Sequence, residues 1–228
     1  MADKFPVDRF RENFVSHYHE ASPAELAAGR SWYPDAHAKV ATWATFAERS
    51  ERNVAALVAV LSPQCPWDRN LQIAEDILCN GYSNTFGALP VNVLKAERVL
   101  AENVENTRDV MPTGRKVENF ARNLSGDYNA VTVDTHMVQA AWNDVTVPAG
   151  PYFKRPIAYD AIANAVRLCA DEVGETPAAF QAIVWTVWKR LHASGVKRHV
   201  LRLHGVKVAR LAKRRKQYAA RVALKVAA

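Results

Sequence analysis

The sequence predicts an all-α fold of two helical lobes followed by a basic helical tail at the C-terminus. Apolar residues recur at helical spacing along most of the chain. Only 9 of the 228 residues are glycine and 49% are hydrophobic, a composition that suits a globular, helix-rich protein. The one strand-like run, Ala-Val-Thr-Val at 130–133, is too short to found a sheet.

Capping residues and prolines mark the helix starts. Ser22 and Glu25 have the spacing of a capping box, and Pro34 occupies the place of a first helical residue. The helix after Pro34 is expected to bury one face, formed by Val40, Trp43, Phe46 and Ala47. Further helices are predicted over 54–61, 68–78, 91–103, 116–124, 137–142 and 156–173, and from 177 onward.

We expect these helices to form two lobes. The central lobe spans 52–133, and the second lobe combines 1–51 with 134–194. A cleft between the lobes is expected to hold a ligand. Residues 195–228 form the predicted helical tail.

The composition also bears on where the protein works. No apolar run approaches the ~20 residues that span a membrane, and the first ten residues lack the apolar core of a signal peptide. The three cysteines, Cys65, Cys79 and Cys169, are too few for a disulfide framework or a four-cysteine metal site. His17 and His19 have no acidic or cysteine neighbours at metal-ligand spacing. The sequence therefore predicts a reduced, cytoplasmic, membrane-free protein with no metal and no cofactor.

Charge is divided unevenly along the chain. Residues 1–175 hold 17 Lys and Arg against 23 Asp and Glu, whereas residues 176–228 hold 13 Lys and Arg and no acid. Clustered positive charge indicates a polyanion partner, although a solvated basic helix would give the same pattern. We expect a monomer that binds DNA, with tail contacts from Arg202, Lys213, Arg214, Arg215 and Lys216.

One stretch of sequence, 114–137, is the candidate for chemistry. A turn leads into Gly114-Arg115-Lys116 at a predicted helix N-terminus, where free backbone N–H groups suit a phosphate. Asp134 follows Lys116 by 18 residues, in Val-Asp-Thr-His just before another helix. Asp134 has two interpretations, as a helix cap or as a carboxylate that stabilises a cationic transition state or assists an amine nucleophile.

This order of motifs resembles the helix–hairpin–helix DNA glycosylases of the endonuclease III type. Their hairpin reads Leu-Pro-Gly-Val-Gly-x-Lys and is followed by a Val-Asp-x-His segment. Leu-Ser-Pro-Gln at 61–64 is similar to the family's Leu-Ser-x-Gln segment, and the likeness covers about 52–142. The resemblance implies a helix–hairpin–helix fold and a flipped DNA base, with Asp134 and Lys116 as catalytic residues and Gln64 filling the gap left by the base. Lys116 would then act either as a Schiff-base nucleophile or as a phosphate contact.

Two departures from that family leave the reaction open. The hairpin here is one residue shorter, with Thr113 in place of the first glycine, and Cys169 is the only cysteine after residue 79, so the four-cysteine iron–sulfur loop is absent. The chain also resembles phage enzymes thought to displace pyrophosphate from hydroxymethylated pyrimidines with an amine. A DNA glycosylase with lyase activity, an amino-group transferase of that phage type and a non-catalytic DNA-binding protein therefore stand as alternatives.

Other side chains are candidates for the base pocket or the DNA contact. His136 follows Asp134 and could contact phosphate, line the pocket or have a structural role. Aromatic side chains stack on flipped bases, although tryptophan at helical spacing is more often in the core. The candidates for the pocket are Trp67, Asp68, Asn70, Gln181 and Trp185.

Overall fold

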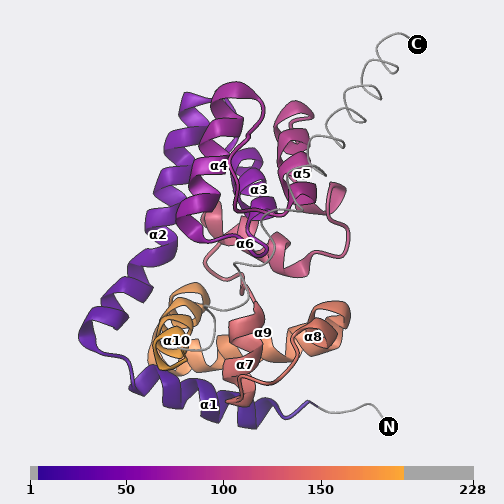
Figure 1. The fold of residues 1–228 in the computed structure, drawn as a ribbon. Coiled ribbons are helices and arrows are strands. Elements are labelled where there is room, and N and C mark those ends of the chain that lie inside the picture. Colours follow the sequence, from indigo (N-terminus) through magenta and orange to yellow (C-terminus); the bar gives the residue numbers. More distant parts are fainter. Residues whose placement is uncertain (1–4, 193–228) are drawn as a thin grey trace.

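The computed structural model describes residues 5–192, and within them the protein is all-α, as predicted (Figure 1). No strand occurs in this part of the chain, so the run at 130–133 does not pair with another strand. The predicted tail, with Arg202, Lys213, Arg214, Arg215 and Lys216, lies outside the described residues.

The described residues form ten α-helices and one 3-10 helix, η1. Their bounds are α1 Val7–His19, α2 Pro23–Phe46, α3 Glu51–Leu61, α4 Trp67–Asn80, α5 Pro90–Ala101, η1 Thr107–Asp109, α6 Arg115–Leu124, α7 Thr135–Trp142, α8 Gly150–Lys154, α9 Pro156–Val173 and α10 Pro177–Leu191. The capping box at the start of α2 is present, with both hydrogen bonds between Ser22 and Glu25.

The helix start predicted at Pro34 is wrong, because Pro34 lies inside the single helix α2. An interior proline removes one helical hydrogen bond and costs about 3 kcal/mol. Packing on both sides of Pro34 offsets that cost, since α2 contacts α10 at Gly29 and buries Val40 further on. The apolar face was also misjudged at its end, where Phe46 is 68% exposed.

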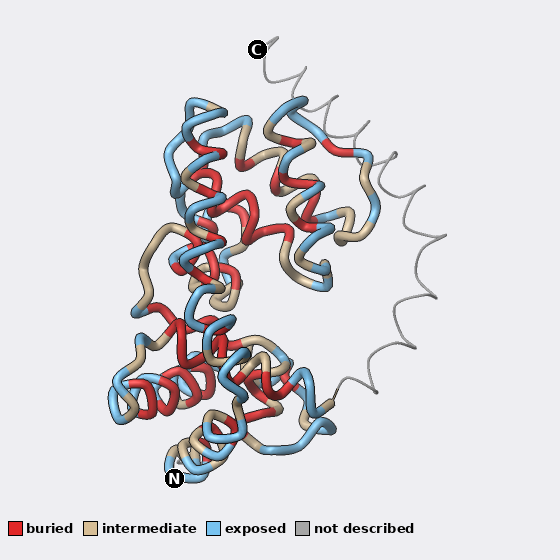
Figure 2. Tube along the Cα trace, turned by 90° about the vertical axis from the view of Figure 1, so that its left-hand side faces the viewer, coloured by how far each residue is buried: buried red, intermediate tan, exposed pale blue. Residues whose placement is uncertain are grey.

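Two hydrophobic clusters form the core (Figure 2). The first surrounds α3, in which every residue from Val54 to Leu61 is buried, and it draws on α2, α4, α5 and α6. The second is built from α1, α7, α9 and α10. The segment of α2 from Tyr33 to Ala44 belongs to the first cluster, and the same helix packs on α10 through Gly29 and Tyr33, so α2 joins the two clusters. This segment packs with α3 and α6 because its buried aromatic face, which includes Tyr33, contacts Phe120 of α6.

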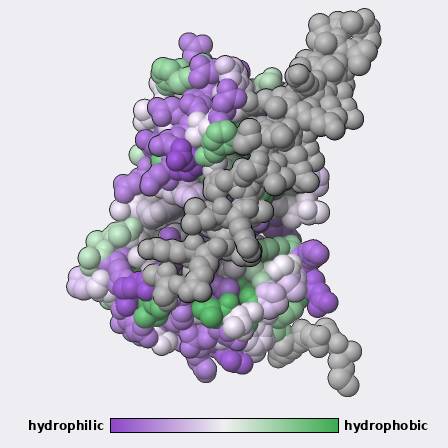
Figure 3. Space-filling model, in the orientation of Figure 1, coloured by the Kyte–Doolittle hydropathy of each residue, from purple (hydrophilic) through white to green (hydrophobic). Residues whose placement is uncertain are grey.

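The described surface has few large apolar side chains. Figure 3 shows a mainly hydrophilic exterior with small apolar areas on the face it presents. None of the helices in the described part of the chain combines the length and the apolar character that crossing a bilayer requires.

Helices α2 and α10 approach closely at Gly29, and replacing this glycine should destabilise the protein. A Cβ atom at Gly29 would lie 2.8 Å from the Cα and N atoms of Ile183, so the two helix backbones would have to separate. We expect Gly29→Ala to lower the free energy of unfolding by about 2 kcal/mol, despite the better helix propensity of alanine. Urea denaturation measures this change. Gly150→Ala is the matched control because a Cβ there meets nothing within 4 Å, and equal stabilities of the two variants would contradict the close approach.

The extended segment 130–133 is held by two side chains instead of a neighbouring strand. The Tyr159 hydroxyl donates to the Val131 carbonyl at 2.9 Å and accepts from the Val133 N–H at 3.0 Å. Asn123 donates to the Ala130 carbonyl at 2.8 Å and accepts from the Thr132 hydroxyl at 2.7 Å. These bonds satisfy buried backbone groups that a sheet would otherwise pair. They also fix the extended segment that immediately precedes Asp134.

Candidate functional site

The Gly-Arg-Lys motif begins α6, as predicted. Gly114 is the N-cap of α6, and a turn closed by the Gly114 N–H on the Met111 carbonyl at 2.9 Å precedes it. Lys116 lies in the first helical turn and is half-buried. Its ammonium donates to the Ser62 hydroxyl at 3.1 Å and lies 5.8 Å from the centre of the Phe120 ring. The lysine is therefore directed toward the end of α3 and not into solvent.

Burial changes the acidity of this amine. Desolvation lowers the pKa of Lys116, and the Asp134 carboxylate acts in the opposite direction. The fold therefore brings Lys116 and Asp134 within electrostatic reach of each other although they belong to different helices. Among the ion pairs of residues 5–192, none joins these two groups directly. A lysine with a lowered pKa carries a larger neutral fraction near pH 7, which a nucleophilic amine requires.

Asp134 is the N-cap of α7, so the structural interpretation of this residue is confirmed. One carboxylate oxygen, Oδ1, accepts from the Met137 backbone N–H at 2.9 Å. The other oxygen, Oδ2, accepts from the Trp185 indole N–H at 3.0 Å. Two donors on two different oxygens fix the plane of the carboxylate, and each oxygen keeps a further lone pair.

Gln64 lies in the loop between α3 and α4. It is exposed and has a φ of 57°, the left-handed region that non-glycine residues rarely adopt. Such backbone strain is concentrated at functional sites. The same loop contains Ser62, the hydrogen-bond partner of Lys116, so the expected wedge and the expected nucleophile are neighbours in the fold.

Two predicted DNA contacts are engaged within the protein. Arg115 forms an ion pair with Asp160 at 2.6 Å, and its guanidinium lies 5.9 Å from the Tyr159 ring centre. His136 is half-buried and packs edge-on against Trp185, with ring centres 5.9 Å apart. Only Nη1 of Arg115 contacts Asp160, so the guanidinium keeps other N–H donors for a phosphate.

The predicted pocket residues do not all converge. Trp67 packs against Trp32 and Phe120, with ring centres 5.2 and 6.2 Å away. Asp68 is exposed, while Asn70 is buried and donates to the Val58 carbonyl. Gln181 is buried and accepts from the Tyr33 hydroxyl at 2.7 Å, so this oxygen is not available to read a base edge. Trp185 alone of this group contacts Asp134.

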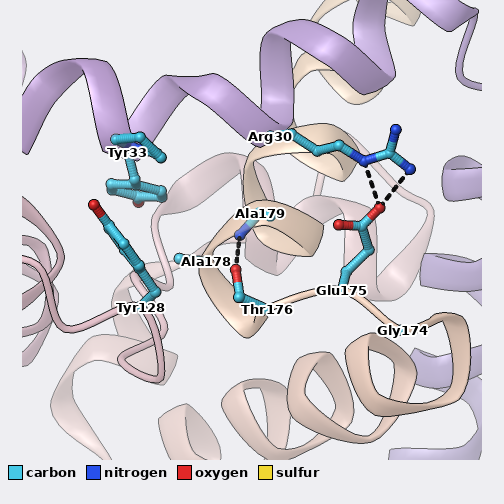
Figure 4. A pocket seen from close by; sticks show the side chains of 9 residues that line it. Arg30, Tyr33, Tyr128, Gly174, Glu175, Thr176, Ala178 and Ala179 are labelled. Atoms are coloured by element: carbon cyan, nitrogen blue, oxygen red, sulfur yellow. Dashed lines mark hydrogen bonds and ion pairs between the residues drawn. The ribbon is translucent and has the colours of Figure 1, made fainter.

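A cavity of about 250 Å³ lies beside Tyr33 (Figure 4). Its lining residues include Tyr33, Tyr128 and the ion pair of Arg30 with Glu175, and none of the predicted site residues lines it. A second cavity, of about 240 Å³, lies between Phe5, Tyr152 and Arg155. Neither of these two cavities is lined by Lys116 or Asp134.

No group of three or more His, Cys, Asp or Glu within residues 5–192 could hold a metal ion. His17 is buried with its ring edge-on to Trp188 at 5.3 Å, and desolvation lowers its pKa.

The sequence did not indicate the role of Ser62 or that of the Trp185 indole N–H. Ser62 lies in the Leu-Ser-Pro-Gln segment, in which only Gln64 was predicted to have a functional role. Its position two residues before Gln64 was the only indication in the sequence that Ser62 lies near the site. Nothing in the local sequence links Trp185 to Asp134, because the two residues are 51 positions apart.

The fold and the site define an all-α protein in which a desolvated lysine and a doubly held carboxylate lie at two helix N-termini. The chain belongs to a family of unknown function, DUF7178, whose model matches residues 1–192. The comparisons with curated proteins and with solved structures gave no match.

Proposed function

We propose that this protein is a DNA-base-acting enzyme of the glycosylase type that flips a nucleotide and cleaves its N-glycosidic bond. The observation that carries the proposal is the amine of Lys116, which donates to the Ser62 hydroxyl at 3.1 Å and whose pKa is lowered by burial and raised by the Asp134 carboxylate. The strained, exposed Gln64 in the adjoining loop supports it, because a wedge that replaces a flipped base must project from the surface.

The chemistry follows from these two groups. Breaking the N-glycosidic bond builds positive charge on the sugar, and a fixed carboxylate stabilises that charge. The neutral Lys116 amine attacks the C1′ carbon of the sugar, and the base leaves with the bonding electrons and takes up a proton. Loss of a proton from nitrogen and opening of the sugar ring then give a Schiff base, from which the strand can be cut.

We expect the tail to supply most of the non-specific DNA affinity, because the described residues carry the opposite charge. Residues 5–192 hold 18 Lys and Arg against 22 Asp and Glu, so their net charge of −4 repels phosphate at long range. The tail carries the opposite charge, with 11 Lys and Arg and no acid in residues 196–228.

Removing residues 206–228 should weaken binding to all DNA sequences alike. The deletion removes eight basic residues: Lys207, Arg210, Lys213, Arg214, Arg215, Lys216, Arg221 and Lys225. If half of them contact phosphates, the slope of log K against log salt should flatten by about 4, at roughly 0.9 per contact. Fluorescence anisotropy over a salt series measures the slope. Substituting the same eight residues by Gln is the matched control for chain length. An unchanged slope in both variants would contradict a DNA contact by the tail.

One experiment separates the proposed reaction from its alternatives. Modified and damaged DNA is incubated with the protein, and the released bases and digested nucleosides are identified by mass spectrometry. A glycosylase releases a free base. An amino-group transferase supplied with an amine releases pyrophosphate and yields a nucleoside that carries the amine in its place. A non-catalytic DNA-binding protein causes neither change. Release of a free base by the unaltered protein, lost in Asp134→Asn, is the expected result.

A further inference from the structure

Three side chains at the N-terminus of α7 form a connected series. The Lys189 ammonium lies 4.0 Å from the centre of the Trp185 ring, and the Trp185 indole donates to Asp134 Oδ2 at 3.0 Å. Lys189 and Trp185 are one helical turn apart on α10, whereas Asp134 begins α7. Capping of α7 does not need Trp185, because Oδ1 alone accepts the Met137 N–H.

We propose that Trp185 is a positioning residue that orients the Asp134 carboxylate, and that Lys189 holds the Trp185 ring in the required place. This inference rests on the proposed function, in which Asp134 is the catalytic carboxylate. It gives Trp185 a role besides the expected stacking on the flipped base, and Lys189 covers one face of the indole ring.

The geometry explains why a second donor matters. A carboxylate held at one oxygen can still turn about its Cβ–Cγ bond, which is a soft torsion. A donor on the other oxygen stops this rotation, and the bond is strengthened because its acceptor is charged. The indole N–H can only donate, so it does not compete for the carboxylate's other partners. A cation over the ring face restrains the indole further.

The contact can be tested without any catalytic assay. The chain has six tryptophans, and ¹⁵N labelling resolves their indole N–H signals. The signal lost in Trp185→Phe identifies Trp185. Asp134→Ser keeps a capping oxygen and removes Oδ2. We expect it to raise hydrogen exchange at the Trp185 indole at least tenfold and to leave the Trp142 indole, which donates to Tyr152, unchanged. Lys189→Met should raise the exchange severalfold, and Lys189→Arg should restore it. An unaltered Trp185 signal in Asp134→Ser overturns the proposal.

A second test measures catalysis by the full chain on its DNA substrate. Trp185→Phe keeps the aromatic ring and loses the donor, so kcat should fall about tenfold while KM stays within twofold. Adding Trp185→Phe to Asp134→Asn should cause no further loss, because both act through one carboxylate. Trp142→Phe is the control and should keep its kcat. A normal kcat in Trp185→Phe contradicts positioning. Altered indole exchange in a protein that releases no base supports the contact and contradicts the proposed function instead.

Discussion

Asp134→Asn should lower turnover about 100-fold or more while the protein stays folded and binds DNA, the effect expected for loss of one electrostatic group at a transition state. The asparagine oxygen can still accept the Met137 N–H and cap α7. Its amide group would meet the Trp185 indole donor to donor, so we also expect a stability loss of about 1–2 kcal/mol. Single-turnover base release measures the first effect and urea denaturation the second.

Asp144 offers a matched control for this substitution. It is an exposed carboxylate that follows α7 and accepts from both the backbone N–H and the hydroxyl of Thr146. Asp144→Asn should leave turnover unchanged. Equal rates for Asp134→Asn and the unaltered protein would contradict the catalytic role and leave Asp134 as a helix cap only.

Lys116 should form a covalent complex with substrate DNA that borohydride traps, and Lys116→Gln should abolish trapping altogether. Glutamine keeps a donor for Ser62, so the substitution removes the amine with little change in packing. Because burial lowers the pKa of Lys116, the trapping rate should rise with pH around a midpoint below that of an ordinary lysine. Gel-shift analysis of the reduced complex at several pH values measures both effects.

Lys154, at the end of α8, is exposed and serves as the control for an unrelated lysine. Lys154→Gln should be trapped as well as the unaltered protein. Base release without any trapped species would show that water is the nucleophile, and Lys116 would then be a phosphate contact.

The sequence predicted much of the fold because its helices are locally determined. The capping box at Ser22 and the prolines at 90, 156 and 177 set helix starts without help from the rest of the chain. Pro34 misled the prediction because its local preference is outweighed by contacts with distant residues, such as that of Gly29 with Ile183. Local rules fail where tertiary packing supplies more free energy than a broken hydrogen bond costs.

The candidate site was predicted in part for the same reason. The motif around Lys116 and the cap at Asp134 can be recognised from neighbouring residues, and the structure bears out both helix starts. The orientation of Gln181 toward Tyr33, and that of Trp185 toward Asp134, depend on how α10 packs. Such long-range contacts are not contained in any local pattern, so the predicted pocket included residues that lie in the core.

The hydroxyl of Tyr159 has a consequence for the order in which the molecule assembles. The segment that leads to Asp134 is hydrogen-bonded to Tyr159 and Asn123. Tyr159 lies on α9, far along the chain, and Asn123 lies on the preceding helix α6. It gains the bonds from Tyr159 only when α9 has docked. A nascent chain that has folded only as far as α6 therefore has Lys116 but no fixed carboxylate. A partly unfolded molecule that has released α9 no longer holds the segment before Asp134 through Tyr159. If Asp134 is the catalytic carboxylate, as proposed, an unfinished chain lacks the fixed carboxylate on which the proposed reaction depends.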